Sequence, residues 1–403
     1  MNEIIRSLTF GSSNIDLQRT AFETELKNFF SKSYSLASKN NLSFYTSRLS
    51  AEPLSVDNEI TDSFLNSFSN RISALSNNLG FRWFCIPFNF SKITDKVVFD
   101  LAFNLLKNKN NAFVHCIFDN NDLVEPDLLL GFANLNLKVS KLSNNGFDNF
   151  RLGASFNVNP NTPFFPFSYS SPKSGFSFAS DSCEIFLNII NSHPKLSFFD
   201  IKNMIVRDYS RYLETLNFIG KTLESETGFK FYGIDCSLAP FPSSDKSVAK
   251  IIELLGNSEF GSPGTLSIVS FLTNIIKESI TTANVDSVGF NGAMLSVLED
   301  DVLSHRASQR NYDINSLLLY SSVCGCGLDM IPLSGNILPE ELASIHMDLI
   351  QLSKRYKKPL GVRFLPIPNR EAGEIAKFSH DFLVDTRIFK NDNQFIEILK
   401  YNY

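Results

Sequence analysis

Stretches with helical periodicity alternate along this chain with short apolar runs, and that order constrains its fold more than any other feature. The clearest helix is predicted at 339–356, where four apolar residues recur on one face: Leu342, Ile345, Leu349 and Leu352. Pro339 suits the first turn of this helix, and an apolar run of strand length, 360–367, follows Pro359. Helices that alternate with buried strands are typical of an α/β fold.

The same pattern predicts further elements on both sides of a Pro-rich stretch. Helices are expected at 16–38, 60–78, 247–255, 265–280 and 313–322. Strands are expected at 82–86, 112–118, 229–238 and 328–333. The range 158–171 is rich in Pro, Phe and Asn, and its aromatic side chains favour a packed loop over a flexible tether. Because no linker is visible, we expect one large domain, 1–403, with approximate halves 1–225 and 226–403.

The composition limits the classes of partner. A chain of 403 residues with 43% hydrophobic content can bury a large core, and a net charge of -5 gives no basic field for nucleic acid. The six cysteines lack the spacing of a disulfide framework. The N-terminus lacks the order of a signal peptide, and the apolar runs are shorter than the roughly 20 residues of a membrane helix. We therefore expect free thiols, a cytoplasmic location and no membrane partner; the abundant Phe residues would permit a homodimer.

A Gly-rich turn, Cys324-Gly325-Cys326-Gly327, lies between a predicted helix and a predicted strand. A thiol in such a turn could act as a nucleophile, an acid or base, or a metal ligand if nearby amides lower its pKa. The alternative is that both cysteines are small buried apolar residues. The pattern favours a functional role for Cys324 more than for Cys326.

Two features could hold an anion. The turn that contains Ser262, Gly264 and Thr265 precedes a predicted helix, so its free amides could bind a phosphate or a carboxylate; capping of that helix is the alternative. Arg363 lies within an apolar strand, and Asp329 follows the Gly-rich turn in another. We expect both side chains to contact a substrate; a structural pair of Arg363 with Asp385, another charge within an apolar run, is the alternative. No nucleotide-binding motif is present.

Several carboxylates are candidates for acid or base chemistry. Asp235 interrupts an apolar strand, and Asp300 belongs to the triplet Glu299-Asp300-Asp301. If that triplet begins a helix, Asp301 and His305 share a face at spacing i, i+4. A divalent metal held by Glu299, Asp301 and His305 is therefore an alternative, and the cofactor is otherwise unknown.

Ordered blocks along the chain resemble an uncharacterised family, domain of unknown function 711. They are Gly-Ile-Asp-Cys-Ser-Leu-Ala-Pro at 233–240, Gly-Ser-Pro-Gly-Thr-Leu at 261–266, Gly-Phe-Asn-Gly-Ala-Met-Leu at 289–295 continuing to 298–300, and Tyr-Ser-Ser-Val-Cys-Gly-Cys-Gly-Leu-Asp at 320–329. Similar blocks at 5–9, 157–166 and 358–366 extend the resemblance to nearly the whole chain.

The resemblance implies a ten-stranded α/β barrel like that of pyruvate formate-lyase, made of two parallel half-sheets of five strands with helices outside and a loop entering the barrel. In glycyl-radical enzymes that loop carries the reactive cysteine, which corresponds to Cys324 by analogy. The range 382–403 contains no glycine, so glycyl-radical chemistry is not expected.

Three positions depart from the family pattern: Ser170 follows Tyr169 where a histidine is frequent, Cys326 replaces a usual threonine, and Asn369-Arg370 replaces a turn richer in glycine. These departures leave open whether this member keeps the family's activity.

These observations favour an enzyme that acts on a small anionic metabolite inside the barrel, as a non-radical lyase or isomerase. Its expected catalytic residues are Cys324, Asp235 and Asp300. Its expected binding residues are Ser262, Gly264, Thr265, Arg363 and Asp329. The alternatives are a ligand-binding or regulatory protein without turnover and a divalent-metal-dependent enzyme.

Overall fold

The computed structural model describes residues 3–54, 60–90, 97–118 and 126–390, and its centre is a sheet of nine strands. The glycine-free range 382–403 is described only as far as residue 390. The strands are β1 Glu3–Ser12, β2 Leu42–Ala51, β3 Phe84–Asn89, β4 Ala112–Phe118, β5 Leu152–Phe156, β6 Gly175–Ser180, β7 Lys230–Asp235, β8 Gly327–Ser334 and β9 Leu360–Ile367.

The sheet is mostly parallel, and its order is β7-β6-β1-β2-β3-β4-β5-β9-β8. Strands β1 to β5 are parallel neighbours, whereas β6 pairs with β1 and β9 pairs with β5 in antiparallel fashion. The pairs β6–β7 and β8–β9 are again parallel. The sheet therefore joins strands from both halves of the chain, and the sequence prediction of an α/β fold is confirmed.

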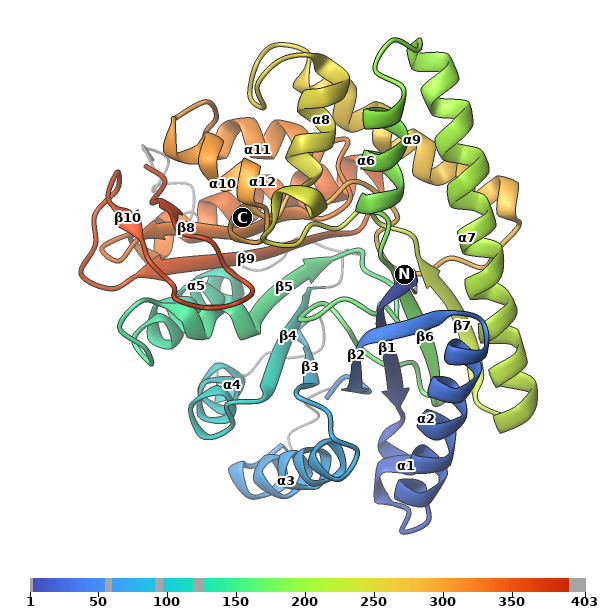
Figure 1. Cartoon of the computed structure of the whole chain (residues 1–403). Helices are drawn as coiled ribbons and strands as arrows, with labels where there is room; N and C mark the ends of the chain where they lie inside the picture. Colours follow the sequence, from blue (N-terminus) through green and yellow to red (C-terminus); the bar gives the residue numbers. More distant parts are fainter. Residues whose placement is uncertain (1–2, 55–59, 91–96, 119–125, 391–403) are drawn as a thin grey trace.

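Helices surround the strands (Figure 1). They are α1 Asn14–Gln18, α2 Phe22–Lys39, α3 Asp62–Asn78, α4 Val97–Asn108, α5 Pro126–Ser140, α6 Cys183–Ser192, α7 Phe198–Thr227, α8 Val248–Gly256, α9 Thr265–Ala283, α10 Asp301–Ser308, α11 Ile314–Ser321 and α12 Pro339–Tyr356. The short 3-10 turns are η2 Phe147–Arg151, η3 Ser244–Lys246 and η4 Val297–Glu299, and a small antiparallel pair is formed by β10 Ile375–Ala376 and β11 Thr386–Arg387. Among the residues that the structure describes, no helix is long and apolar enough to span a membrane.

The predicted bounds of α12, β4 and β9 are confirmed. The helix predicted at 16–38 is in fact two helices, because the chain leaves helical geometry at Arg19, whose backbone is extended. The strand predicted at 229–238 ends at Asp235, where the carboxylate bonds the backbone of the next turn and ends the regular pairing.

The loop 157–171 packs against the sheet. Thr9 donates from its hydroxyl to Pro163 O (2.9 Å), and Ser170 N donates to Ala51 O (2.8 Å), which ties the loop to β1 and β2. At Gly361 in β9, an added Cβ would lie 2.7 Å from the ring of Phe167. Phe164, Phe165 and Phe167 are buried and Tyr169 is half-buried, so the prediction of a packed loop is confirmed.

The range 287–296 contacts both outermost strands of the nine-stranded sheet. Parallel bridges join Ser287 to Ile234 in β7 and Ala293 to Leu238 just beyond it. A third parallel bridge joins Ser296 to Asp329 in β8. This irregular segment therefore lies between the two edge strands.

Candidate functional site

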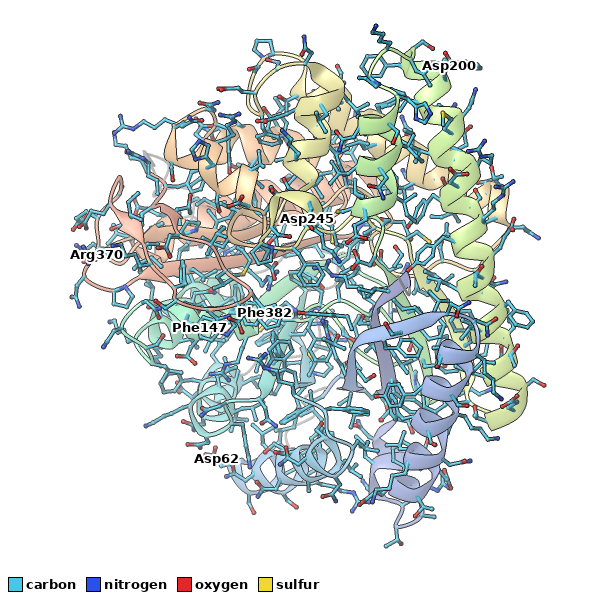
Figure 2. All side chains as sticks on the ribbon, viewed as in Figure 1. Asp62, Phe147, Asp200, Asp245, Arg370 and Phe382 are labelled. Atoms are coloured by element: carbon cyan, nitrogen blue, oxygen red, sulfur yellow. The ribbon has the colours of Figure 1, made fainter. Side chains whose placement is uncertain are left out.

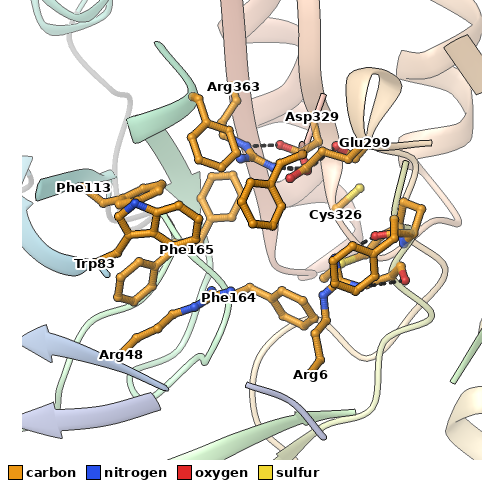
Figure 3. A pocket seen from close by; sticks show the side chains of 18 of the residues that line it. Arg6, Arg48, Trp83, Phe113, Phe164, Phe165, Glu299, Cys326, Asp329 and Arg363 are labelled. Atoms are coloured by element: carbon orange, nitrogen blue, oxygen red, sulfur yellow. Dashed lines mark hydrogen bonds and ion pairs between the residues drawn. The ribbon is translucent and has the colours of Figure 1, made fainter. Parts of the chain in front are cut away.

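A cavity of about 70 Å³ is lined by charged and aromatic residues from distant parts of the chain (Figure 3). Its charged lining side chains are Arg6, Arg48, Glu299, Asp329 and Arg363. Its aromatic lining side chains are Tyr45, Trp83, Phe113, Phe150, Phe164, Phe165, Phe167, Phe241 and Phe382. Met294, Ser296 and Cys326 also line it.

Arg363 organises the acidic side of the cavity. Its Nε donates to Asp329 Oδ1 (2.5 Å) and its Nη2 to Asp329 Oδ2 (2.8 Å), while Nη2 also donates to Glu299 Oε2 (2.6 Å). Burial lowers the pKa of Arg363, but the two carboxylates outweigh burial and the net pKa is raised. Burial also raises the pKa of Asp329, and Arg363 opposes that rise. The bidentate pair fixes Asp329 in place, and the further bond from Nη2 holds Glu299 beside it.

Arg48 lies on the opposite side of the cavity and is only partly satisfied (Figure 3). Its Nε donates to Thr46 Oγ1 (3.1 Å), and its guanidinium carbon lies 5.1 Å from the ring centre of Phe165. Within the described part of the chain, its terminal nitrogens have no hydrogen-bond acceptor and no carboxylate partner. Burial, Arg6 and Arg363 lower its pKa to about 9, so it remains cationic at neutral pH.

Arg6 adds a second positive charge on this side. It donates from Nη1 to Ala239 O (3.1 Å) and from Nη2 to Pro240 O (2.7 Å). Its guanidinium carbon lies 4.1 Å from the ring centre of Phe241. These contacts hold Arg6 in one position beside Arg48, so the charge of Arg6 is a fixed feature of the cavity.

Aromatic rings form the remaining wall. Trp83 packs edge-on against Phe113 and Phe382, and Phe113 contacts Phe165. Trp83, Phe113 and Phe165 belong to a second apolar cluster that is separate from the main core. Phe147 and Phe382, which lie near each other in Figure 2, pack against this cluster. This apolar wall lowers the local dielectric constant, which strengthens the interaction of a ligand with the charged groups opposite.

The two cysteines of the Gly-rich turn face different spaces. Cys326 lines the cavity, and its sulfur accepts a hydrogen bond from Leu295 N (3.1 Å). Cys324 instead borders a surface hollow of about 680 Å³ together with Lys358. A hydrogen bond from Cys326 and the charge of Lys358 lower the pKa of Cys324 to about 6, whereas that hydrogen bond and burial raise the pKa of Cys326.

Asp235 is buried at the end of β7 and does not line the cavity. Its carboxylate accepts hydrogen bonds from Ser237 Oγ (2.6 Å) and from the backbone N–H of Ser237 (3.0 Å) and Phe290 (2.8 Å). Burial raises its pKa to about 6. The contacts connect β7 to the range 287–296.

Asp300 is also buried away from the cavity. It caps α10 through Leu303 N (3.0 Å), and it accepts hydrogen bonds from Val248 N (2.8 Å) and Ala249 N (3.0 Å) at the start of α8. Ser247 Oγ donates to it as well (2.6 Å). Burial raises its pKa. One carboxylate therefore serves the N-termini of two helices.

The predicted anion turn also lies outside the cavity. Thr265 Oγ1 donates to Ser262 O (2.8 Å) and accepts a hydrogen bond from Gly261 N (3.1 Å). Gly264 is the N-cap of α9 and supplies no side-chain cap. The Thr265 hydroxyl thus stabilises the turn itself.

The alternative metal ligands are not gathered in one place. Glu299 points toward Arg363, whereas Asp301 and His305 are exposed on α10. Across the ranges that the structure describes, no group of three His, Cys, Asp or Glu side chains is arranged to hold a metal ion.

Of the residues predicted from sequence, the structure brings Arg363 and Asp329 together at the cavity and adds Glu299 beside them. Sequence analysis assigned no role to Arg6, Arg48 or the aromatic wall. A charged residue within a strand could have indicated that Arg48 is a site residue. The strand itself was not predicted, because β2 is rich in polar residues.

Fold and site together define an α/β protein with a cavity that combines arginines, carboxylates and aromatic rings. The chain belongs to the family described as Uncharacterised ACR (DUF711), whose model matches residues 3–381.

Relatives of the chain bear the name UPF0210 protein. One from Pyrobaculum arsenaticum is 27% identical over 227 residues, which cover 56% of this chain and 51% of the relative. Another from Syntrophobacter fumaroxidans is 32% identical over 187 residues, covering 46% of this chain and 41% of the relative. The chain therefore spans about half the length of these curated relatives in the matched region.

Proposed function

We propose that this chain binds a small anionic metabolite in the interior cavity and acts on it as a non-radical lyase or isomerase. The observation that carries the proposal is Arg48, a cation at the cavity whose terminal nitrogens have no acceptor among the described residues. A carboxylate or phosphate would supply the missing acceptors in a charge-assisted, bidentate contact.

The charge and size of the cavity support a small anion. Three positive and two negative side chains line it, which leaves one positive charge to be balanced. A volume of about 70 Å³ corresponds to roughly five to seven waters at about 10–15 Å³ each. A ligand of only a few non-hydrogen atoms suits this space.

The proposal includes a closed barrel of ten strands, similar to pyruvate formate-lyase, around the cavity. It is supported by the parallel bridges that the range 287–296 makes to both edge strands. With that range as the tenth strand, β1 to β5 form one parallel half-sheet and the remaining strands form the other.

Within this proposal, Glu299 and Cys326 are the acid and base groups nearest a bound anion. They replace Cys324, Asp235 and Asp300 in this role, because these three predicted residues do not line the cavity. Cys326 keeps its proton at neutral pH, since its pKa is raised, and could donate it, while the Glu299 carboxylate could accept one.

A cytoplasmic location is part of the proposal. All six cysteines are free and buried, which supports a reducing compartment.

Calorimetric titration of the purified protein with acetate, propanoate and inorganic phosphate tests the anion site. We expect binding by the wild type and a loss of about 10- to 100-fold in affinity for Arg48→Gln, because a hydrogen bond to a charged group contributes roughly 1.5–3 kcal/mol. Arg211→Gln is the matched control, since the Arg211 side chain is 71% exposed on α7.

Two results would contradict the proposal. One is a folded wild type that binds none of these anions, and the other is equal affinity in Arg48→Gln and wild type. Thermal unfolding of both variants establishes that they are folded.

A further inference from the structure

We propose that the ligand is a short-chain 2-hydroxycarboxylate and that Glu299 is the residue that selects its hydroxyl group. This inference rests on the proposed function, and it adds a second recognition group opposite Arg48.

Glu299 presents an open hydrogen-bond acceptor. Its Oε2 accepts hydrogen bonds from Arg363 Nη2 (2.6 Å) and from Ser296 Oγ (2.6 Å). For Oε1, the described residues provide no donor. The Glu299 side chain is 19% exposed and lines the cavity, so Oε1 is accessible to a ligand.

Asp329 cannot play the same role. Arg363 occupies its Oδ1 and its Oδ2 through the bidentate pair, and its side chain is only 7% exposed. The two carboxylates that share Arg363 therefore differ: Asp329 is fully engaged, whereas Glu299 retains one free oxygen.

The cavity thus has two poles on opposite sides (Figure 3). Arg48 and Arg6 form a positive pole that accepts an anionic group. Glu299 forms the other pole and accepts a hydrogen bond. The poles are close enough to influence each other, because Glu299 raises the pKa of Arg48 while Arg6 and Arg363 lower it. A ligand that satisfies both poles carries a carboxylate and, near it, a hydrogen-bond donor.

Charge distinguishes a hydroxyl donor from an ammonium donor. The lining carries one excess positive charge. A hydroxycarboxylate, with one negative charge, neutralises it, whereas a zwitterionic amino acid leaves it unbalanced. The volume of about 70 Å³ limits the carbon skeleton to a few atoms, and the aromatic wall provides an apolar surface for a methyl group.

The test compares propanoate, 2-hydroxypropanoate and alanine by calorimetric titration. For the wild type we expect 2-hydroxypropanoate to bind about tenfold more tightly than propanoate, since an unpaired donor or acceptor is costly when buried. In Glu299→Gln this advantage should shrink: the Gln carbonyl oxygen is required by Arg363 and Ser296, which turns the amide NH2 toward the ligand, and a neutral hydrogen bond from that NH2 to the hydroxyl replaces the charge-assisted one. Propanoate should bind this variant at least as well as the wild type.

Glu259→Gln is the matched control, because the Glu259 side chain is 55% exposed and distant from the cavity lining. The wild-type comparison does not depend on the folding of any variant.

The outcomes separate the two proposals. Equal wild-type affinity for propanoate and 2-hydroxypropanoate would overturn the role of Glu299 and leave the anion site standing. Tighter binding of alanine than of 2-hydroxypropanoate would overturn the choice of a hydroxyl donor. Absence of binding by all three carboxylates would remove the anion site as well.

Discussion

The two cysteines of the Gly-rich turn show how neighbouring positions acquire opposite chemistry. The Cys326 thiol donates to Cys324, and Lys358 lies on the same side as Cys324, so the negative charge of a thiolate is stabilised there. The same hydrogen bond and burial keep Cys326 protonated. Because Cys324 borders the surface hollow and Cys326 the interior cavity, the more acidic thiol is on the side away from the proposed ligand.

Alkylation by iodoacetamide should therefore be fastest at Cys324 among the six cysteines. Its pKa is lowered to about 6, so the thiolate population rises as the pH increases through about 6 and is nearly complete at pH 7. Peptide mapping of the native protein between pH 5 and 9 gives the rate at each cysteine. Cys326→Ala removes the first cause of the lowered pKa, and the midpoint for Cys324 should move to higher pH. A midpoint near 8.5 in the wild type would contradict this assignment.

Sequence could identify Arg363 because a lone charge within an apolar strand must find a partner or a ligand. It could not identify Arg48, because β2 contains Ser43, Thr46 and Ser47 and shows no continuous apolar run. Whether a strand arginine is paired depends on residues far away in the sequence: the carboxylates of Arg363 come from positions 299 and 329, and the neighbours of Arg48 provide none. Local pattern carries no information about that difference.

At the level of elements, Asp300 connects α8, which the sequence predicted, with α10, which it predicted only conditionally. Its position before α10 is typical of an N-cap, but its second role at the start of α8 depends on the approach of two segments some fifty residues apart. Sequence analysis also assigned no element to 198–227, although Ser197 and Gly228 are typical residues at the two ends of a helix. Ser197 and Gly228 could therefore have been used to predict α7, but they were not.

Asp300→Ala should lower the free energy of unfolding by roughly 3–5 kcal/mol, because three backbone N–H groups and one hydroxyl lose a buried acceptor. The control is Asp313→Ala, which removes the exposed N-cap of α11 and should cost only about 1 kcal/mol. Urea unfolding followed by circular dichroism measures both values. Equal losses in the two variants would show that the contacts of Asp300 to α8 contribute nothing.

For the whole molecule, the sequence predicted an α/β fold but could not give the order of strands. The antiparallel pairs β1–β6 and β5–β9 join strands that are far apart in the chain. Their pairing depends on which strand edges are still unpaired once strands close in sequence have paired with each other. The expected barrel came from the resemblance and not from periodicity. Its closure requires the range 287–296, whose Gly and Asn residues give no strand pattern.

Gly289 tests how much that range contributes to stability. Its φ of 78° is unfavourable for other residues, and an added Cβ would lie 2.0 Å from Asp235 Oδ2, an atom that is buried and hydrogen-bonded. Gly289→Ala should therefore lower the free energy of unfolding by about 3 kcal/mol or more, the sum of backbone strain and overpacking. Gly228→Ala is the control: its φ is 76°, but no atom lies within 4 Å of the added Cβ, so only the backbone cost of roughly 1–2 kcal/mol applies.

Urea unfolding monitored by fluorescence of Trp83, the single tryptophan, compares the two variants at a site remote in sequence from both substitutions. A larger loss for Gly289→Ala than for Gly228→Ala would show that the close approach of Gly289 to Asp235 contributes to the stability of the fold. Equal losses would contradict this expectation, because the backbone cost alone would then account for both variants.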